Sequence, residues 1–302
     1  MIRGLYTAAS GMYALQNRQE VLANNLANVN TPGYKETEGV IRSFPEQLIA
    51  RIRDNQVPSI PGVPTMPGQP VNIGRLHTGA YLSESIASFA QGDIVKTDNQ
   101  FDIALTDNLP YPQDPARVND KPVQPKLFFS VARLDDPANP APQDAIRYTR
   151  NGKWNLNDEG YLVTMDGYYL LDQNNQPIQV QDVPTSASRD ITVSSEGVIT
   201  LPDQQTRVTL GIKVANNPYE MVNDGGNVYR YGGQGELANV MDDPNNAGFF
   251  AVRQGWMERS NVDPTRTMTD MMTVLRSYEA NQRVISTIDG TMEKAVNEIG
   301  KL

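Results

Sequence analysis

The sequence contains no cysteine and a single histidine, His77, among its 302 residues. The absence of cysteine excludes disulfide bonds and thiolate metal ligands. One histidine cannot form a multi-histidine metal site, and it would have to act alone as the base of any Ser–His nucleophile. A lone histidine in a segment with Gly and Thr is typical of a surface residue. The sequence therefore indicates no enzyme of these kinds, and we expect no cofactor.

Basic residues and long apolar runs are also scarce. The chain has 35 acidic against 26 basic residues, which gives a net charge of −9. Because phosphate neutralisation supplies most non-specific affinity for nucleic acids, an acidic chain without a Lys/Arg cluster binds them poorly. No apolar run is long enough for a membrane span, and the amphipathic N-terminal segment lacks the apolar run of a cleavable signal peptide. We therefore expect neither nucleic-acid binding nor membrane insertion.

Both ends of the chain carry apolar residues at alternating spacings of three and four, which indicates long helices with a narrow seam. The N-terminal seam comprises Leu5, Ala8, Met12, Leu15, Leu22, Leu26 and Val29. Pro32-Gly33 follows it as a helix stop. Asp263-Pro264 is typical of an N-cap followed by proline at the first helical position. The C-terminal seam beyond it comprises Met268, Met271, Leu275, Tyr278, Gln282, Ile285, Met292, Val296 and Ile299.

The middle of the chain indicates short strands joined by tight turns. Asn151-Gly152 separates RYTR from KWNL, residues 157–160 (NDEG) separate KWNL from YLVT, and Asp166-Gly167 separates YLVT from YYLL. Asn-Gly and Asp-Gly between alternating runs are strong hairpin signals. Residues 191–201 follow the same plan, with a turn at Ser195-Glu196-Gly197. These patterns predict a hairpin-rich β region.

We therefore predict an α+β protein in three parts. Residues 1–35 and 255–302 form a helical core in which the N- and C-terminal helices pair as a coiled coil. Residues 80–254 form a hairpin-rich all-β domain, and residues 36–79 link the two. Within the linker, prolines recur at every third residue from Pro58 to Pro70, as in polyproline II. The segment 57–70 fits a stiff spacer better than a docking ligand, because basic residues are absent from the repeat.

The β region also contains residues that could form a chemical site. Trp154 and Trp256, with Tyr168 and Tyr169, could form a sugar-stacking surface or could pack within and between hairpins. Alternation within the hairpins favours packing. Acidic residues are abundant, so spacing alone leaves open a glycosidase-like carboxylate pair, but no two of them stand out.

The terminal helices point to contacts with other subunits. One seam buries too little surface to stabilise a lone helix of this length, and the C-terminal helix covers only one face of its partner. Asn24, Asn25 and Asn28 lie off the seam, where a solvated helix usually carries Lys or Glu. Amides buried between close-packed helices can hydrogen-bond across an interface and set its register. For Asn28, a helix-end cap explains the residue equally well.

The predicted subunit interface combines the seams with these amides. It comprises Leu5, Met12, Leu15, Leu22, Asn24, Asn25, Leu26 and Asn28 in the N-terminal helix, and Met271, Leu275, Tyr278, Ile285 and Met292 in the C-terminal helix.

Residues 10–35, SGMYALQNRQEVLANNLANVNTPGYK, closely resemble the N-terminal signature of the bacterial flagellar rod and hook axial proteins. The hallmark of that signature is NNLANVNTPGYK. Residues 252–302 resemble the C-terminal module of the family. TRNGKWNLNDEGYLVTMDGYYLL, at 149–171, resembles the β domain of distal rod and hook-basal-body proteins. The segments 57–70 and 108–142 depart from the family pattern, which leaves the rod subclass open.

The resemblance implies a structural subunit of the flagellar basal-body rod in the cell envelope. Such a subunit would be exported by the flagellar type III apparatus without cleavage of a signal peptide. It would polymerise with copies of itself and with other rod and hook axial proteins into a hollow helical rod that transmits torque. The alternative from another class is an extracellular β domain that binds a glycan or protein ligand on a coiled-coil stalk.

Overall fold

A computed structural model describes residues 2–45, 47–51, 71–76, 78–112, 115–118, 121–134, 136–137, 139–180, 191–201, 207–233, 235–243, 246 and 248–299. His77 and the proline-spaced segment 57–70 lie outside these residues. The contacts of the chain define two compact units. Unit 1 comprises Met1–Asn24, Glu38–Ile86 and Thr265–Leu302, and unit 2 comprises Asn25–Thr37 and Ala87–Pro264.

The chain passes from one unit to the other four times, after residues 24, 37, 86 and 264. Each passage lies within a regular element: α1 (Ile2–Ala27), β1 (Thr37–Ser43), β4 (Ala80–Ala87) or α2 (Pro264–Lys294). The division differs from the predicted one, because residues 25–35 and 255–264, predicted to belong to the helical core, group with the β-rich unit, whereas most of the predicted linker groups with the helices. The contacts of residues 25–35 and 255–264, described below, give the reason.

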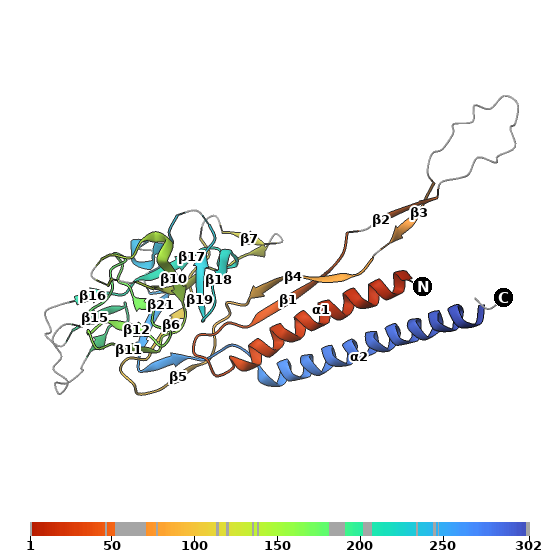
Figure 1. Cartoon of the computed structure of the whole chain (residues 1–302). Helices are drawn as coiled ribbons and strands as arrows, with labels where there is room; N and C mark the ends of the chain where they lie inside the picture. The colour runs from red at the N-terminus through yellow and green to blue at the C-terminus, as the bar shows by residue number, and fades with distance from the viewer. Residues whose placement is uncertain are drawn as a thin grey trace, which may run out of the picture. The chain divides into compact units, whose positions relative to one another are not determined.

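Unit 1 contains the two long helices, which lie side by side and run in opposite directions (Figure 1). Glycines of α1 mark the contact: a side-chain carbon on Gly4 would lie 3.5 Å from Ile288, and one on Gly11 would lie 3.1 Å from Asn281. The step from Gly4 to Gly11 in α1 thus corresponds to the step from Ile288 back to Asn281 in α2, as expected of two antiparallel helices in contact. Helix α2 begins at Pro264, as predicted, and continues into a π-helical turn, Ala295–Ile299.

Two-stranded ribbons complete unit 1. Strand β1 pairs with β4, and β2 (Gln47–Arg51) pairs antiparallel with β3 (Val71–Leu76). The first ribbon packs on α1, because a side-chain carbon on Gly39 of β1 would lie within 4 Å of Val21 in the helix and of Leu82 in β4. The Ser10 hydroxyl in turn accepts the amide N–H of Ala80 at 3.3 Å.

The face of α2 that is covered within the chain differs in part from the predicted seam. The shielded positions include Thr267, Met271, Val274, Tyr278, Asn281, Ile285, Ile288 and Met292. Met271, Tyr278, Ile285 and Met292 were predicted. Leu275 was placed on the same seam but is 38% exposed, and Met268 is exposed as well. Apolar residues flank Met271 on both sides of the line of shielded residues along α2. The spacing of apolar residues alone therefore does not show which of them face α1.

Unit 2 is built on a nine-stranded sheet. Its main path runs β11 (Trp154–Leu156), β12 (Leu162–Thr164), β13 (Tyr169–Leu170), β9 (Lys126–Ala132), β10 (Ile146–Thr149), β19 (Val228–Tyr231) and β18 (Met221–Asn223). Strand β17 (Ile212–Ala215) pairs with β9 and with β20 (Ala238–Asn239). Residues 127–132 of β9 are buried without alternation. This pattern is expected of a strand covered on both faces.

Shorter pairs surround this sheet. Strand β5 (Ile94–Lys96) pairs with β22 (Trp256–Glu258), and β6 (Ile103–Asp107) pairs with β21 (Phe250–Gln254). Strands β14 (Thr192–Val193), β15 (Val198–Thr200) and β16 (Arg207–Thr209) form a three-stranded sheet, and β7 (Arg117–Val118) pairs with β8 (Lys121–Pro122). Short 3-10 helices lie at Gln143–Ala145, Pro218–Glu220 and Val240–Asp242.

Three of the four predicted hairpin turns join paired strands. These are residues 157–160 between β11 and β12, Asp166-Gly167 between β12 and β13, and residues 195–197 between β14 and β15. The hairpin at Asn151-Gly152 was predicted wrongly, because β10 pairs with β9 and β19 and not with β11. The backbone of β6 passes so close that a side-chain carbon on Gly152 would collide with the Ile103 carbonyl oxygen. The glycine serves this close crossing.

The core of unit 2 is centred on Phe129 and Trp154, whose rings meet edge to face at 4.9 Å.

Replacing Phe129 with Ala should lower the free energy of unfolding by about 3–5 kcal/mol, because a wholly buried ring leaves a cavity. Denaturant titration followed by tryptophan fluorescence measures this change. The matched control is Phe249→Ala, which removes an exposed ring and should change the free energy by less than about 1 kcal/mol. Equal effects of the two changes would contradict the assigned core.

Candidate functional site

The Asn-rich segment folds back on the end of α1 through the side chain of Asn25, which is 0% exposed. Its Nδ2 donates to the carbonyl oxygen of Thr37 at 2.8 Å. Its Oδ1 accepts the amide N–H of Thr37 at 3.0 Å and the hydroxyl of Tyr34 at 3.1 Å. This corrects the inter-subunit contact expected for Asn25. A side chain with no exposed surface in the single chain presents nothing to a neighbour.

The other two asparagines have different surroundings. Asn24 is exposed. Asn28 is half-buried in the turn after α1, where its Oδ1 accepts the hydroxyl of Thr31 at 3.1 Å and its carbonyl oxygen accepts the Thr31 amide N–H. This geometry favours the helix-ending role for Asn28 over a contact with another subunit. For Asn24 the interface role stays a prediction.

Gly33 places the loop directly against the β body. Its φ of +66° belongs to the left-handed region, and a side-chain carbon there would lie 2.5 Å from the Arg150 backbone. The Gly33 amide N–H donates to the Glu258 carbonyl oxygen at 2.8 Å. The preceding carbonyl, that of Pro32, accepts the Asn227 side-chain amide at 2.8 Å. Only glycine combines this backbone conformation with so close an approach.

A buried chain of charges lies beneath this loop. Glu258 Oε1 accepts Lys35 Nζ at 2.7 Å, and Glu258 Oε2 accepts Arg150 Nε at 3.0 Å. Arg150 also donates from a terminal nitrogen to Asp107 at 2.9 Å, and Asp107 contacts Lys126 at 3.2 Å. The side chains of Lys35, Glu258, Arg150 and Asp107 are each at most 2% exposed.

Burial and mutual attraction determine the ionisation of these groups. Burial, followed by repulsion from Arg150, lowers the pKa of Lys35 to about 8 despite the attraction of Glu258. Burial alone would raise the pKa of Glu258, but Arg150 and Lys35 together hold it below its usual value. Arg150 and Lys126 likewise lower the pKa of Asp107 against the effect of burial. Both carboxylates are therefore ionised at neutral pH.

Sequence reasoning missed these charged residues. The available signal was a charge beside residues that belong in a core: Glu258 ends the strand Trp256-Met257-Glu258, and Arg150 follows Tyr148-Thr149. Such positions are buried only when the charge is paired. The partner of each charge, however, is far away in the sequence, because 223 residues separate Lys35 from Glu258.

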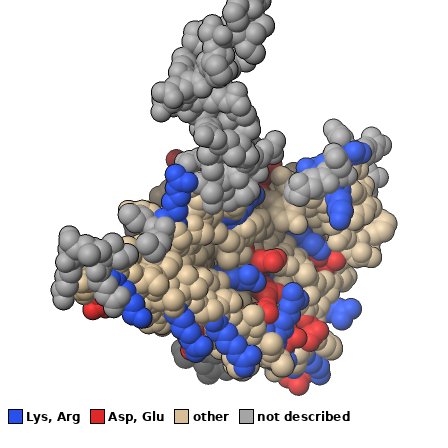
Figure 2. Space-filling model, turned by 90° about the vertical axis from the view of Figure 1, so that its right-hand side faces the viewer, with Lys and Arg blue, Asp and Glu red and all other residues tan. Residues whose placement is uncertain are grey.

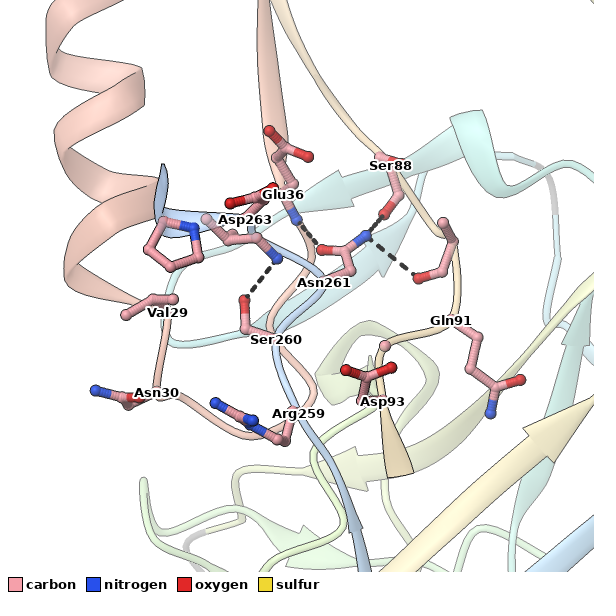
Figure 3. A pocket seen from close by; sticks show the side chains of 14 residues that line it. Val29, Asn30, Glu36, Ser88, Gln91, Asp93, Arg259, Ser260, Asn261 and Asp263 are labelled. Carbon is pink, nitrogen blue, oxygen red and sulfur yellow. Dashed lines mark hydrogen bonds between the residues drawn. The ribbon is translucent and has the colours of Figure 1, made fainter. Parts of the chain in front are cut away.

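Asn261 ties three segments together at one wall of a neighbouring cavity of about 590 Å³ (Figure 3). Its Oδ1 accepts the Glu36 amide N–H at 2.6 Å, and its Nδ2 donates to the carbonyl oxygens of Ser88 at 2.9 Å and Ala90 at 3.3 Å. Asp93 and Arg259 also line the cavity. The polar groups of Asn261 thus bind backbone, which suits a joint between segments and not a reaction centre.

The aromatic residues considered for sugar binding lie mainly in packing contacts. Trp154 is buried against Phe129, and its Nε1 donates to the Asn151 carbonyl oxygen at 3.2 Å. Tyr169 packs edge to face on Tyr161 at 5.6 Å. The guanidinium group of Arg253 lies 5.8 Å from the ring centre of half-buried Trp256. Packing was the favoured prediction for this group, and for Trp154 it is confirmed.

Charged side chains on the drawn face of the molecule are mixed in sign. Figure 2 shows Lys and Arg interspersed with Asp and Glu among mostly uncharged residues. Among the described residues, no helix has the length and apolar character needed to cross a membrane.

Asn25→Ala should lower the free energy of unfolding of unit 2 by about 3 kcal/mol, because it removes three hydrogen bonds that the buried amide makes with Tyr34 and Thr37. Asn30→Ala is the matched control, at an exposed position of the same unit, and should change it by less than about 0.5 kcal/mol. Both tryptophans lie in unit 2, so their fluorescence during denaturation reports this unit. A small effect at Asn25, or an equal one at Asn30, would contradict the loop closure described above.

Asp107→Asn should lower stability by about 3 kcal/mol at pH 7, because it breaks a buried ion pair. The folded-state pKa of Asp107 is lowered, so its contribution is present above the unfolded-state value of 3.8 and is lost as the pH falls through the folded-state value. The difference between wild type and variant should therefore shrink below pH 3.8. Denaturant titrations between about pH 7 and about pH 3 measure it, and a constant difference would refute an ionised Asp107.

Three family models match the chain. The flagella basal body rod protein model matches residues 5–35, the flagellar hook protein FlgE/F/G D1 domain model matches 128–201, and the flagellar basal body rod FlgEFG protein C-terminal model matches 253–298. Their matched ranges contain Lys35, Arg150 and Glu258 respectively. Three separate family segments thus each supply one charge of the buried chain.

Full-length relatives show the same likeness. The flagellar hook-basal body complex protein FlhO of Bacillus subtilis (strain 168) is 35% identical over 302 residues, which cover 100% of both chains. The flagellar basal-body rod protein FlgG of Caulobacter vibrioides is 30% identical, in an alignment that covers 97% of both chains. FlgG of Bacillus subtilis (strain 168) is 27% identical, in an alignment that covers 98% of this chain and 99% of the relative. The chain belongs to the family of flagellar basal-body rod and hook proteins.

Proposed function

We propose that this structural subunit of the flagellar basal-body rod polymerises through the outward faces of α1 and α2. The product is a hollow helical rod, built with copies of itself and with other rod and hook axial proteins, that transmits torque. Family membership supports the structural role and the location in the basal body.

The observation that carries the proposal is a set of apolar side chains left exposed on both helices. Tyr6 and Tyr13 are 66% and 71% exposed and lie seven residues apart in α1. On α2, Met268, Met272 and Leu275 are exposed within two turns of helix. Single exposed apolar residues are normal, but a repeated apolar line along a helix is typical of an interface.

The covered faces of the helices support a coiled-coil pairing of α1 with α2 as part of the same proposal. Leu22 is buried in the single chain, whereas Leu5, Met12, Leu15 and Leu26 are half-buried. In α2, Met271, Tyr278, Ile285 and Met292 are half-buried too. Each of these seams therefore keeps surface for a second contact. A face that binds a different face of the next copy, without closing a ring, generates a helical filament.

Export by the flagellar type III apparatus, without cleavage of a signal peptide, completes the proposal. It rests on family membership. Helices that are largely uncovered in the single chain also suit a subunit whose ends become ordered on assembly.

Leu275→Asp should abolish assembly while the β-rich unit stays folded, because it places a charge on the exposed apolar line without removing a buried group. Sedimentation and electron microscopy of the purified chain over a wide concentration range measure polymer formation. Amide exchange of β9 and β10 verifies the fold of unit 2.

The matched control is Ala280→Asp, which adds the same charge to an exposed position of α2 away from that line. It should weaken assembly far less. Polymerisation of Leu275→Asp at wild-type concentration would overturn the proposed interface. Wild-type helices as strongly protected in the monomer as β9 would argue instead for a stable stalk.

A further inference from the structure

We propose that Glu258 is a latch that makes closure of the Asn-rich loop conditional on the arrival of the chain's last strand. The loop comprises residues 25–37, and the last strand is β22, which ends at Glu258. The inference concerns folding of the single chain. It is independent of the proposed polymerisation and is tested on the monomer.

One residue of β22 holds the loop in two ways. Its backbone carbonyl accepts the Gly33 amide N–H at 2.8 Å, and its carboxylate accepts Lys35 Nζ at 2.7 Å. The same carboxylate oxygen accepts the Gly92 amide N–H at 3.0 Å, at the approach to β5. Because β5 is the pairing partner of β22, the carboxylate is in place only when β22 has joined the sheet pair.

Lys35 has few other partners in the interior. Its side chain is 1% exposed, and besides Glu258 it donates to the Ala90 carbonyl oxygen at 2.8 Å. Among the other charges of the cluster, Arg150 lowers the pKa of Lys35 and Asp107 raises it more weakly. Without Glu258, closure of the loop would bury an ammonium group that has lost the anion it contacts and is still repelled by a guanidinium group. An unpaired buried charge is strongly unfavourable, so the loop stays open until the carboxylate arrives.

Arg150 does not depend on Glu258 to the same degree. Its guanidinium group also binds Asp107 at 2.9 Å and the carbonyl oxygens of Leu127 at 2.8 Å and Leu105 at 3.1 Å. The β body can therefore bury Arg150 before β22 docks. The loop, in contrast, brings its own cation, and Glu258 is the anion that Lys35 contacts.

Closure of the loop fixes the end of α1, because Tyr34, next to Lys35, binds Asn25 at 3.1 Å. The two ends of the latch are 223 residues apart. A chain that emerges from its N-terminus therefore keeps the loop open until almost the whole of unit 2 is present. The Lys35–Glu258 pair therefore sets the order of two folding events: β22 docks first, and the Asn-rich loop closes afterwards.

The test is amide exchange of the full-length monomer, read at Tyr34 and Thr37. These amides donate to Thr31 and Asn25, so they report loop closure without bonding to β22 themselves. In Glu258→Gln their exchange should be at least about tenfold faster, while amides of β9 keep wild-type rates. The double variant Lys35→Met with Glu258→Gln should return to within about threefold of wild type, because its loop no longer brings a charge.

Asp107→Asn is the control, since it removes the other anion of Arg150 and leaves the Lys35–Glu258 pair intact. It should not accelerate Tyr34 and Thr37 more than β9. If adding Lys35→Met to the Glu258→Gln variant fails to restore protection, the latch is overturned, because Glu258 would then act through its strand alone.

Pulse-labelled exchange during refolding decides the question even if Glu258→Gln does not fold. In the wild-type chain, Tyr34 and Thr37 should become protected together with β22 or after it. In Lys35→Met their protection should precede that of β22. Protection of these two amides before β22 in the wild-type chain would overturn the proposal.

Discussion

A buried carboxylate in contact with two buried cations is the constraint around which unit 2 is arranged. Glu258 lies at the end of β22, Lys35 lies in the Asn-rich loop and Arg150 follows β10. Replacing such an ionic group with apolar residues is often neutral or stabilising, so its presence is weak evidence for stability alone. The buried ion pairs instead favour the native pairing of segments over incorrect pairings, because an incorrect pairing would leave an unpaired charge in the interior. The charges therefore specify which segments meet.

The Asn-rich hallmark of the family has a physical explanation in this setting. Asn25 supplies both a donor and an acceptor to the backbone of Thr37, which a charged side chain could not do. Gly33 allows the backbone to pass close to the backbone of Arg150. The side-chain amide of Asn261 donates hydrogen bonds to carbonyl oxygens of the segment before β5. These residues hold segments that are distant in the sequence together within unit 2. The outward apolar residues of α1 and α2 are a separate surface, suited to other subunits.

Local signals carried most of what could be predicted of the fold. The heptad spacing, Pro264 and the Asp-Gly turn act over a few residues, and the elements that they predict are present. Asn151-Gly152 misled because its turn is shaped by Ile103, a neighbour in space. Asn25 appeared to need a partner from another subunit because Thr37 lies beyond the helix stop. Lys35 and Glu258 are 223 residues apart, and no spacing pattern in the sequence connects residues at that distance. A single sequence therefore does not show that these two charges pair.

The four passages of the chain between its units carry a mechanical consequence. Most two-domain proteins are joined by one linker, which bears any pulling force alone. Here α1, β1, β4 and α2 each continue across the division, so four covalent connections join the two units. Cutting one of them leaves the other three, so a single break in the backbone does not separate the units.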